Sequence, residues 1–344
     1  MKIGLVIYGE LEKESGGYLY DRRLVQHLKR SSFEVDVISL DKEEDDLSNI
    51  KNNFLDTYKM KLERYDLLLQ DELCFLSLFE LNDRLKEDIE IVSIVHHLSC
   101  EAERDKEKRK MWRYFEKSYL ESVDRFILNS EPTYSSVEDL DGKVDGVTAP
   151  PGKDHLDVTL GDEVTNEEME ILFVGNFTPT KCIDVILQAV RRLEDVKLRL
   201  VGDVEWDEEY GEKIKKMIGE MEKGKVEVLG RVDKNRLKKE YRRADVFLLP
   251  SKYEGYGISM IEALGHHIPV IATARGGPKE IIEDGKEGFL VEPENVDELR
   301  TKLKYLRDNS VERKEMGENA RARYEELPTW EESMEKVKEF LSKE

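Results

Sequence analysis

The chain has 344 residues, a length that favours two domains of about 150 residues over one single core. Hydrophobic residues make up 39% of it and charged residues 38%, a composition that excludes an intrinsically disordered protein. The formal net charge of -21 argues against a general nucleic-acid binder, because contacts to phosphates require a concentrated basic surface. We therefore expect a globular protein of two domains with no nucleic-acid partner.

Short β-branched and aliphatic runs alternate with helical or charged stretches through the first half of the chain. The first run is followed by a loop that ends in Gly16-Gly17 and by an amphipathic helix through Leu24 and Leu28, which makes one β-α-β unit. Strands joined by crossover helices form a parallel sheet. The expected strands cover residues 3–8, 35–40, 67–69, 91–95, 126–129 and 146–149.

Pro150-Pro151-Gly152 interrupts this pattern, and the polar stretch that continues to Glu168 is typical of a linker. A second series of strands with intervening helices then predicts another doubly wound sheet. Helices should fill the tail from Val311, with a break at Pro328. The strands of this second series are expected at residues 171–174, 198–201, 226–229, 246–249, 270–272 and 289–291.

The sequence thus predicts an α/β protein with two Rossmann-like, doubly wound, parallel-sheet domains. Residues 1–160 form the first domain and residues 161–325 the second. A ligand should bind in the cleft between the carboxyl ends of the two sheets, so functional residues are expected in loops that follow strands.

The strongest motif begins at Pro250, after the strand at 246–249, and places Glu254 in a loop before a helix that starts near Gly257. The free backbone N–H groups of Gly257, Ile258 and Ser259 at that helix start suit an anion such as a diphosphate. Glu262, one turn into the helix, can accept hydrogen bonds from a ribose diol. The alternative is a surface loop followed by a solvated helix, which the strand, glycine and helix context disfavours.

A second motif, Gly175-Asn176-Phe177-Thr178-Pro179-Thr180-Lys181, follows the first strand of the second domain. Lys181 could place a positive charge on a diphosphate. Taken alone, the segment reads more simply as a helix start. The P-loop pattern is absent, so hydrolysis of nucleoside triphosphates has no support.

In the first domain, Gly16-Gly17 could offer backbone N–H groups to a phosphate or a sugar, although a plain turn explains this pair equally well. His96-His97 follows the strand at 91–95, which puts at least one imidazole where it can bond a sugar hydroxyl. Histidines after strands are also common as ordinary loop residues.

Together these motifs resemble the retaining glycosyltransferases of family 4, which have the two-domain GT-B fold, and the resemblance covers nearly the whole chain. Its most specific element is the E-x7-E signature, here Glu254 and Glu262. The stretch around Trp330 resembles the final helix of the family, about residues 326–344, which joins the first domain. Supporting matches are Gly16-Gly17, His96, Asn129-Ser130-Glu131, Gly175 to Lys181, Leu229 to Val232 and Gly276 to Glu280.

The resemblance implies a transfer of sugar from a nucleotide-diphosphate sugar, with a UDP- or GDP-sugar the expected donor, no bound metal, and an unidentified acceptor. It assigns the donor sugar to Glu254 and the ribose to Glu262. Lys181 and the amides of Gly257, Ile258 and Ser259 match the diphosphate contacts of the family. It assigns the contacts with the nucleobase to Arg231 and Val232, and His96 matches the family histidine near the sugar.

One position departs from the family pattern, because Asn176 stands where an arginine usually precedes the lysine by five residues. That departure keeps a non-catalytic sugar-nucleotide binder as an alternative. A nicotinamide-dependent oxidoreductase is a further alternative, since Asp41 ends the second strand, but the first loop has no G-x-G-x-x-G. The triplet Asp139-Leu140-Asp141 is interpreted as a surface loop rather than a metal site.

The cysteines Cys74, Cys100 and Cys182 lie far apart and form no metal-ligand or disulfide spacing, which suits a reducing compartment. The apolar run at the N-terminus is too short for a signal peptide. We expect a cytoplasmic protein, and residues 104–117, with seven Lys or Arg against three acids, raise the possibility of peripheral contact with the inner membrane face. A helix whose aromatic residues pack on the first domain is the simpler interpretation of that segment.

Overall fold

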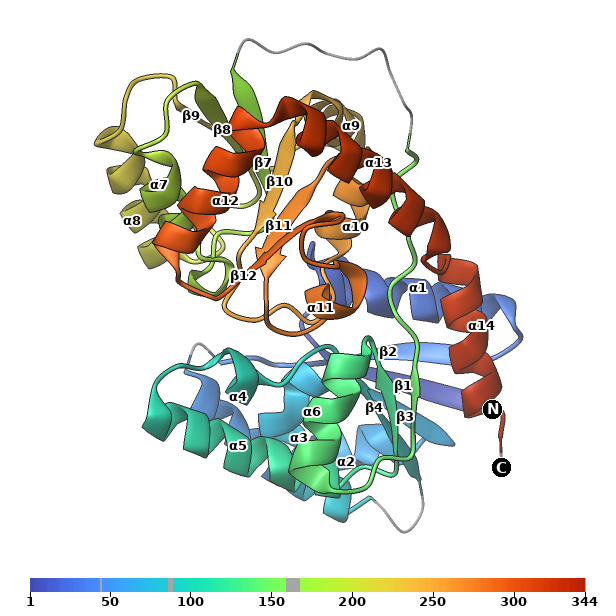
Figure 1. Ribbon diagram of the computed structural model, residues 1–344. Helices are drawn as coiled ribbons and strands as arrows, with labels where there is room; N and C mark the ends of the chain where they lie inside the picture. The colour runs from blue at the N-terminus through green and yellow to red at the C-terminus, as the bar shows by residue number, and fades with distance from the viewer. Residues whose placement is uncertain (44, 86–88, 159–167, 344) are drawn as a thin grey trace. The chain divides into compact units, whose positions relative to one another are not determined.

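The computed structural model describes residues 1–43, 45–85, 89–158 and 168–343. It divides into two compact units (Figure 1). Unit 1 contains Met1–Pro151 and Trp330–Glu344, and unit 2 contains Gly152–Thr329. Residues 159–167, most of the predicted linker, lie outside the described part of the chain.

Unit 1 is built on a parallel sheet with the strand order β2-β1-β3-β4-β5-β6. Its central strand β3 is buried at every residue, as expected for a strand covered on both faces. The strands are β1 (Lys2–Tyr8), β2 (Glu34–Leu40), β3 (Leu67–Asp71), β4 (Glu90–Val95), β5 (Arg125–Leu128) and β6 (Gly146–Thr148).

Helices flank the sheet of unit 1. Because the strand order reverses at β1, right-handed crossovers put α1 on one face and the helices that follow β3, β4 and β5 on the other. The C-terminal helix α14 packs against α1 and contacts β6, while α5 packs against α3 and α6. The helices are α1 (Gly16–Arg30), α2 (Asp56–Leu62), α3 (Phe75–Asp83), α4 (Ser99–Ala102), α5 (Lys106–Glu121), α6 (Glu131–Asp141) and α14 (Trp330–Leu341), with 3-10 segments η1 (Asp46–Phe54) and η2 (Glu72–Cys74).

Unit 2 has a second parallel sheet, with the order β12-β11-β10-β7-β8-β9. Its apolar side chains form one buried cluster that the strands share with the flanking helices. The strands are β7 (Met169–Val174), β8 (Val196–Val201), β9 (Val226–Gly230), β10 (Val246–Leu249), β11 (Val270–Thr273) and β12 (Gly288–Val291).

The helices of unit 2 also lie on two sides of their sheet. Helix α7 packs against α8 and α12, and α10 packs against α13. They are α7 (Ile183–Val190), α8 (Glu208–Gly219), α9 (Lys234–Arg243), α10 (Ile258–Gly265), α11 (Pro278–Ile281), α12 (Val296–Asp308) and α13 (Ser310–Glu326), with a 3-10 turn η3 (Pro179–Lys181).

The strand order fixes where ligands can approach each sheet. In unit 2 the strands β8 and β9 follow on one side of β7, whereas β10, β11 and β12 follow on its other side. The switch point therefore lies between the carboxyl ends of β7 and β10. In unit 1 the equivalent point lies between β1 and β3. Both predicted doubly wound sheets are therefore confirmed, and all of the predicted strands are present within one or two residues of their expected bounds.

Candidate functional site

Two loops meet at the switch point of unit 2, one after β7 and one after β10. They are joined by a backbone hydrogen bond of 2.8 Å from the Lys252 N–H to the Thr180 carbonyl. Lys181 ends the 3-10 turn η3, two residues before α7, and its Nζ lies 2.7 Å from Oε2 of Glu254. Lys181 and Glu254 thus form one ion pair at the position that the fold provides for a ligand.

The carboxylate of Glu254 is held from a second side as well. The buried Ser251 hydroxyl donates to its Oε2 at 3.2 Å. The Glu254 side chain is 13% exposed and that of Lys181 is 27% exposed, so both polar heads remain reachable from solvent. A bound anion could therefore compete with Glu254 for the lysine, and the carboxylate would then be available to sugar hydroxyls.

Helix α10 begins without a side-chain cap. Ser15, Asp207 and Asp233 cap α1, α8 and α9 with a side-chain oxygen, but at Gly257, the residue that precedes α10, no side chain accepts the first N–H groups. Gly257 has a φ of 100°, a conformation that favours glycine. The amides of Ile258 and Ser259 are left for another acceptor, which is the arrangement that binds phosphate at helix starts.

Glu262 lies on the first turns of α10 and is 5% exposed. Burial raises its pKa to about 7, although the hydrogen bond that Tyr241 donates to Oε2 at 2.7 Å opposes this rise. The same Tyr241 hydroxyl lies 3.0 Å from the carbonyl of Ser259. Tyr241, on α9, therefore orients the carboxylate, and no local pattern in the sequence pointed to this role.

Gly276 and Gly277, which follow β11, pack directly against the backbone of the Glu254 loop. The Gly277 N–H donates to the Glu254 carbonyl at 2.9 Å. A β-carbon on Gly276 would lie 2.1 Å from that carbonyl oxygen, and one on Gly277 would lie 2.4 Å from the carbonyl of Gly255. Only glycine permits this close packing of two backbones.

Asn176 occupies the loop after β7, where the family pattern has an arginine. Its Oδ1 accepts a hydrogen bond of 3.3 Å from the N–H of Asp203, in the loop after β8. Asp203 also pairs with Arg231, whose Nη2 lies 2.8 Å from Oδ2. Asn176 thus ties two loops together, while Arg231 is 52% exposed and the adjoining Val232 packs partly on the core of unit 2.

The predicted residues of unit 1 gather at its own switch point. His96, the first residue after β4, is 8% exposed, and its Nε2 lies 3.5 Å from Oδ1 of Asp21 on α1. Gly16 and Gly17 begin α1, and Gly17 faces the His96 ring. Asn129 donates a hydrogen bond of 2.8 Å to the His96 carbonyl. The sequence did not predict the participation of Asp21.

Three further expectations are answered by unit 1. The triplet Asp139 to Asp141 forms the end of helix α6, so its interpretation as a surface loop was wrong. Asp41, the acid on which the oxidoreductase alternative rests, accepts a hydrogen bond of 3.1 Å from Tyr58 on α2. In the basic segment, Trp112 packs edge-on against Phe75 of α3, and Phe115 lies against Phe79, as the simpler interpretation of that helix predicts.

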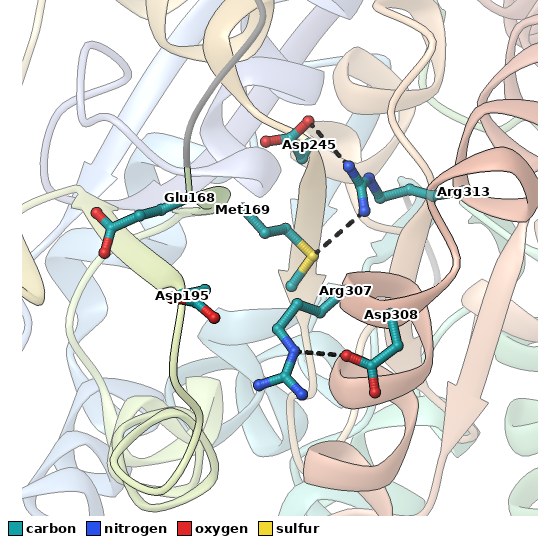
Figure 2. Close-up of a pocket in the computed structure, with 7 residues that line it drawn as sticks. All are labelled: Glu168, Met169, Asp195, Asp245, Arg307, Asp308 and Arg313. Atoms are coloured by element: carbon teal, nitrogen blue, oxygen red, sulfur yellow. Dashed lines mark hydrogen bonds and ion pairs between the residues drawn. The ribbon is translucent and has the colours of Figure 1, made fainter.

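A pocket of about 290 Å³ opens at the other end of the unit 2 sheet (Figure 2). Met169 begins β7 and Asp245 directly precedes β10, so this pocket adjoins the amino ends of the strands. Two ion pairs lie in its lining, Arg307 with Asp308 at 2.7 Å and Arg313 with Asp245 at 3.7 Å. The pocket is separate from the loops of the predicted site. Its lining consists of Glu168, Met169, Asp195, Asp245, Arg307, Asp308 and Arg313.

Fold and loops together define a two-domain α/β architecture of the GT-B type, with the ligand loops of unit 2 at the switch point. Residues 162–323 match the family model of glycosyl transferases group 1. No helix of the described residues is both long and apolar enough to cross a membrane.

Curated relatives match parts of the chain. It is 33% identical over 174 residues to an uncharacterised glycosyltransferase of Methanocaldococcus jannaschii, a match that covers 50% of this chain and 48% of that protein. It is 32% identical over 250 residues to the trehalose synthase of Thermococcus litoralis, which covers 66% of this chain and 59% of that protein. The matches thus span 48% and 59% of the lengths of these two relatives.

Solved structures share the fold along the whole chain. The sucrose-phosphate synthase from Thermosynechococcus elongatus superposes with a TM-score of 0.84 at 20% identity and covers 99% of this chain and 98% of that chain. HepE of Anabaena, solved in complex with UDP and glucose, has a TM-score of 0.78 at 16% identity, with 99% of each chain covered. These similarities show the GT-B fold.

Proposed function

We propose that this protein is a glycosyltransferase that takes a sugar from a nucleotide-diphosphate sugar held by unit 2. The observation that carries the proposal is the meeting of Lys181, Glu254 and the uncapped start of α10 at the switch point of the sheet. A cation and free amides suit the diphosphate, and buried Glu262 suits the ribose diol. The match of residues 162–323 to glycosyl transferases group 1 supports this reading.

A UDP- or GDP-sugar is the proposed donor. HepE, which shares the fold, was solved with UDP-glucose as well as with UDP and glucose, and this supports a uridine nucleotide first. Arg231 and Val232 lie after β9, where a nucleobase would be contacted. A panel of UDP-, GDP-, ADP- and dTDP-sugars in a thermal-shift assay tests the choice, because a ligand of the folded state raises the melting temperature. No shift with any of them would refute donor binding.

The proposed transfer proceeds with retention at the anomeric carbon and without a metal at the diphosphate. Lys181 and the amides of α10 would stabilise the negative charge that develops on the departing phosphate. That phosphate oxygen would take the proton of the acceptor hydroxyl, which attacks the same face of the sugar. An inverted product, identified by NMR of its anomeric proton, would contradict the mechanism.

A non-catalytic sugar-nucleotide binder is the second candidate, and Asn176 in place of the usual arginine favours it. Asn176 bonds the neighbouring loop and offers no positive charge to a leaving group. A measurement of donor turnover distinguishes the two functions. A glycosyltransferase releases nucleotide slowly by donor hydrolysis even without acceptor, and Glu262→Ala should abolish that release, whereas a binder shows a thermal shift and no release.

Peripheral membrane contact through residues 104–117 remains a separate proposal. Since Trp112 and Phe115 pack on α3, the groups left for a surface are the basic side chains and Tyr114, which is 67% exposed. The contact would be electrostatic and sensitive to salt. Co-sedimentation with vesicles of anionic and of neutral lipid tests it, and absence from both pellets would exclude it.

A further inference from the structure

Three side chains of unit 1 converge where the carboxyl ends of β3 and β4 meet the start of α1. Asp71 is the last residue of β3, His96 is the first residue after β4, and Asp21 lies on the second turn of α1. Each offers one nitrogen or oxygen atom, and these three atoms all lie within 4.8 Å of one another. We refer to Asp21, Asp71 and His96 as the unit 1 triad.

The triad is almost sealed from solvent. Asp21 and Asp71 are 0% exposed, and the His96 residue is 8% exposed. Both oxygens of Asp21, Oδ2 of Asp71 and Nε2 of His96 have no hydrogen-bond partner among the described residues. Buried carboxylates without hydrogen bonds are strongly unfavourable unless a positive charge compensates them. His96 Nε2 and Asp21 Oδ1 can form an ion pair at 3.5 Å, but among the described residues no group accepts or donates to Oδ2 of Asp21 and Oδ2 of Asp71.

Charges near the triad do not meet this need. The groups that act on Asp71 with positive charge are His96 and, with the smallest effect, Lys42. Burial and the carboxylate of Asp21 together raise the pKa of Asp71 to about 7. Burial alone would lower the pKa of His96, but the nearby Asp21 carboxylate raises it. The raised pKa of Asp71 and the raised pKa of His96 both mean that the triad attracts positive charge, either as protons or as a metal cation.

From this geometry we propose that the unit 1 triad binds a divalent first-row transition metal ion, with Asp21, Asp71 and His96 as its three protein ligands. Two ligand atoms on one such ion, at bonds of about 2.1 Å and a tetrahedral angle, lie about 3.4 Å apart. Nε2 of His96 and Oδ1 of Asp21 are 3.5 Å apart. The Asp71 oxygen lies within 4.8 Å of both of these atoms, so the Asp71 side chain would have to shift toward the ion to complete the set.

The donor set also selects the kind of metal. One imidazole with two carboxylates suits zinc or manganese better than calcium or magnesium, which prefer oxygen alone. Two ionised carboxylates balance the charge of a divalent ion and leave His96 neutral. Three protein ligands leave coordination positions for water or a substrate oxygen.

Groups that contact the three ligands hold them in orientation, as such groups do in other metal sites. Asp71 accepts a hydrogen bond of 3.0 Å from the Leu73 N–H through Oδ1, which leaves Oδ2 for the ion. The Tyr20 ring packs edge-on against His96, with 5.5 Å between the ring centroids. A β-carbon on Gly17 would lie 3.3 Å from Nε2 of His96. Glycine at this position therefore keeps the ligand edge of the imidazole uncovered.

This site is distinct from the donor loops of unit 2, and the inference does not rest on the proposed transferase activity. It does reassign Nε2 of His96 from a sugar contact to a metal ligand. Binding of UDP, measured by thermal shift in parallel, reports on unit 2 alone. A failure of the metal proposal and a failure of the proposed function are thus distinguishable.

The test uses the full chain without an affinity tag, stripped with a chelator and titrated with Zn²⁺, Mn²⁺ and Co²⁺. We expect about one equivalent of metal per chain by elemental analysis after desalting, and visible absorption bands for the Co²⁺ form. Asp21→Asn and Asp71→Asn should each lower the affinity by more than about 100-fold, since even changes at residues that only contact a metal ligand lower it about 10- to 100-fold. Asp83→Asn, at an exposed aspartate of the same unit, is the matched control and should bind normally.

A protonated triad makes opposite predictions. In that case the stripped chain binds no metal in stoichiometric amount, its melting temperature does not respond to Zn²⁺ or Co²⁺, and Asp71→Asn is as stable as the parent or more so. Such a result overturns the metal site. Equal Co²⁺ spectra in the parent chain and in both asparagine variants would overturn it as well.

Discussion

At the scale of single residues, the site of unit 2 depends on two glutamates in different environments. Glu254 is partly exposed and paired with Lys181, so its negative charge is already balanced. Glu262 is buried with only a tyrosine hydroxyl as donor, and its pKa is raised to about 7. Their spacing of eight residues places one in the loop and the other on the helix, which separates their tasks.

Nucleotide affinity should depend on pH through Glu262. Because a ribose diol donates hydrogen bonds to the ionised carboxylate, the dissociation constant for UDP should rise about tenfold per pH unit as the pH falls below 7. Isothermal titration calorimetry between pH 5.5 and 8.5 measures this slope. Glu262→Gln should bind more weakly and show a flat profile, whereas a slope unchanged by that substitution would assign the titration to another group.

The same group also affects the stability of the unliganded protein. The folded-state pKa of Glu262 lies above the usual value of a glutamate, 4.5. Its contribution to stability is therefore fully present below that value and is lost as the pH rises through about 7. As the pH rises from about 4.5 to about 7, the melting temperature of the parent chain should fall relative to that of Glu262→Gln.

Residue-scale features were only partly predictable from the sequence. Glu254 and Lys181 were each found from a strand-loop-helix pattern, but their 2.7 Å contact joins positions 73 apart in the chain. Tyr241 and Asp21 gave no signal, because they lie on helices and their roles arise from tertiary packing alone. Asp139 to Asp141 was wrongly taken as a loop, since Gly142 ends helix α6 only after the triplet.

At the scale of elements, the loop after β11 holds the loop after β10 by direct backbone packing. Gly276→Ala should weaken UDP binding by about tenfold or more, because its β-carbon would lie 2.1 Å from the Glu254 carbonyl and displace that loop. Gly285→Ala is the matched control, as it also has a positive φ, of 87°, but no atom within 4 Å of the added carbon.

Both glycine variants should lose about 1 kcal/mol of unfolding free energy from their backbone conformation. Gly276→Ala should lose more than this, because its β-carbon also meets the Glu254 carbonyl. Urea unfolding measures that loss, and the same samples serve for calorimetric titration with UDP. Equal loss of affinity in the two variants would show that the effect is general destabilisation and that the contact with Glu254 is unimportant.

A buried charge network joins β8 to α9. Arg199 is 1% exposed, and its Nε and Nη2 lie 2.7 and 2.6 Å from Oε2 of Glu240, which is 2% exposed. Nη1 reaches Glu227 at 3.0 Å. The network fixes α9, and with it Tyr241, against the sheet.

Glu240→Ala should lower the free energy of unfolding by about 3–5 kcal/mol, because it leaves the Arg199 cation buried with too little compensation. Urea denaturation followed by circular dichroism provides the value. Glu212→Ala removes a comparable but exposed pair, with Lys215, and should leave stability unchanged. A small loss in Glu240→Ala would mean that Glu227 and solvent compensate Arg199.

The sequence predicted elements far better than contacts. Each strand of the two sheets consists of a short apolar run between turn residues, a local pattern that survives without any tertiary information. The supports of the site, such as Gly276 against Glu254 and Arg199 against Glu240, depend on which strands become neighbours. The sequence did not predict the order of the strands in each sheet, so these contacts were not predictable.

At the scale of the whole molecule, unit 1 is assembled from both ends of the chain. Helix α14 packs on α1 and buries Trp330, Met334, Val337, Phe340 and Leu341. Trp330 also lies edge-on to Tyr20, with centroids 5.9 Å apart. At about 1.5–3 kcal/mol per buried apolar side chain, the helix contributes as much as many domains have in total.

A chain ending at Thr329 should therefore fail to fold unit 1 while unit 2 remains folded. Limited proteolysis should digest residues before 152 and leave a resistant fragment that still binds UDP. A chain ending at Leu341, which keeps α14, is the control and should resist digestion throughout. Digestion of the entire truncated chain would show that unit 2 cannot fold without unit 1.

The division of unit 1 into two segments has a consequence for synthesis on the ribosome. Residues 1–151 are translated before unit 2, but helix α14, which packs on α1, is translated only after unit 2. The nascent first sheet must wait, with part of its apolar surface uncovered, while the whole of unit 2 is made and can fold ahead of it. During that interval, we expect the early half of the chain to bind chaperones that recognise exposed apolar segments.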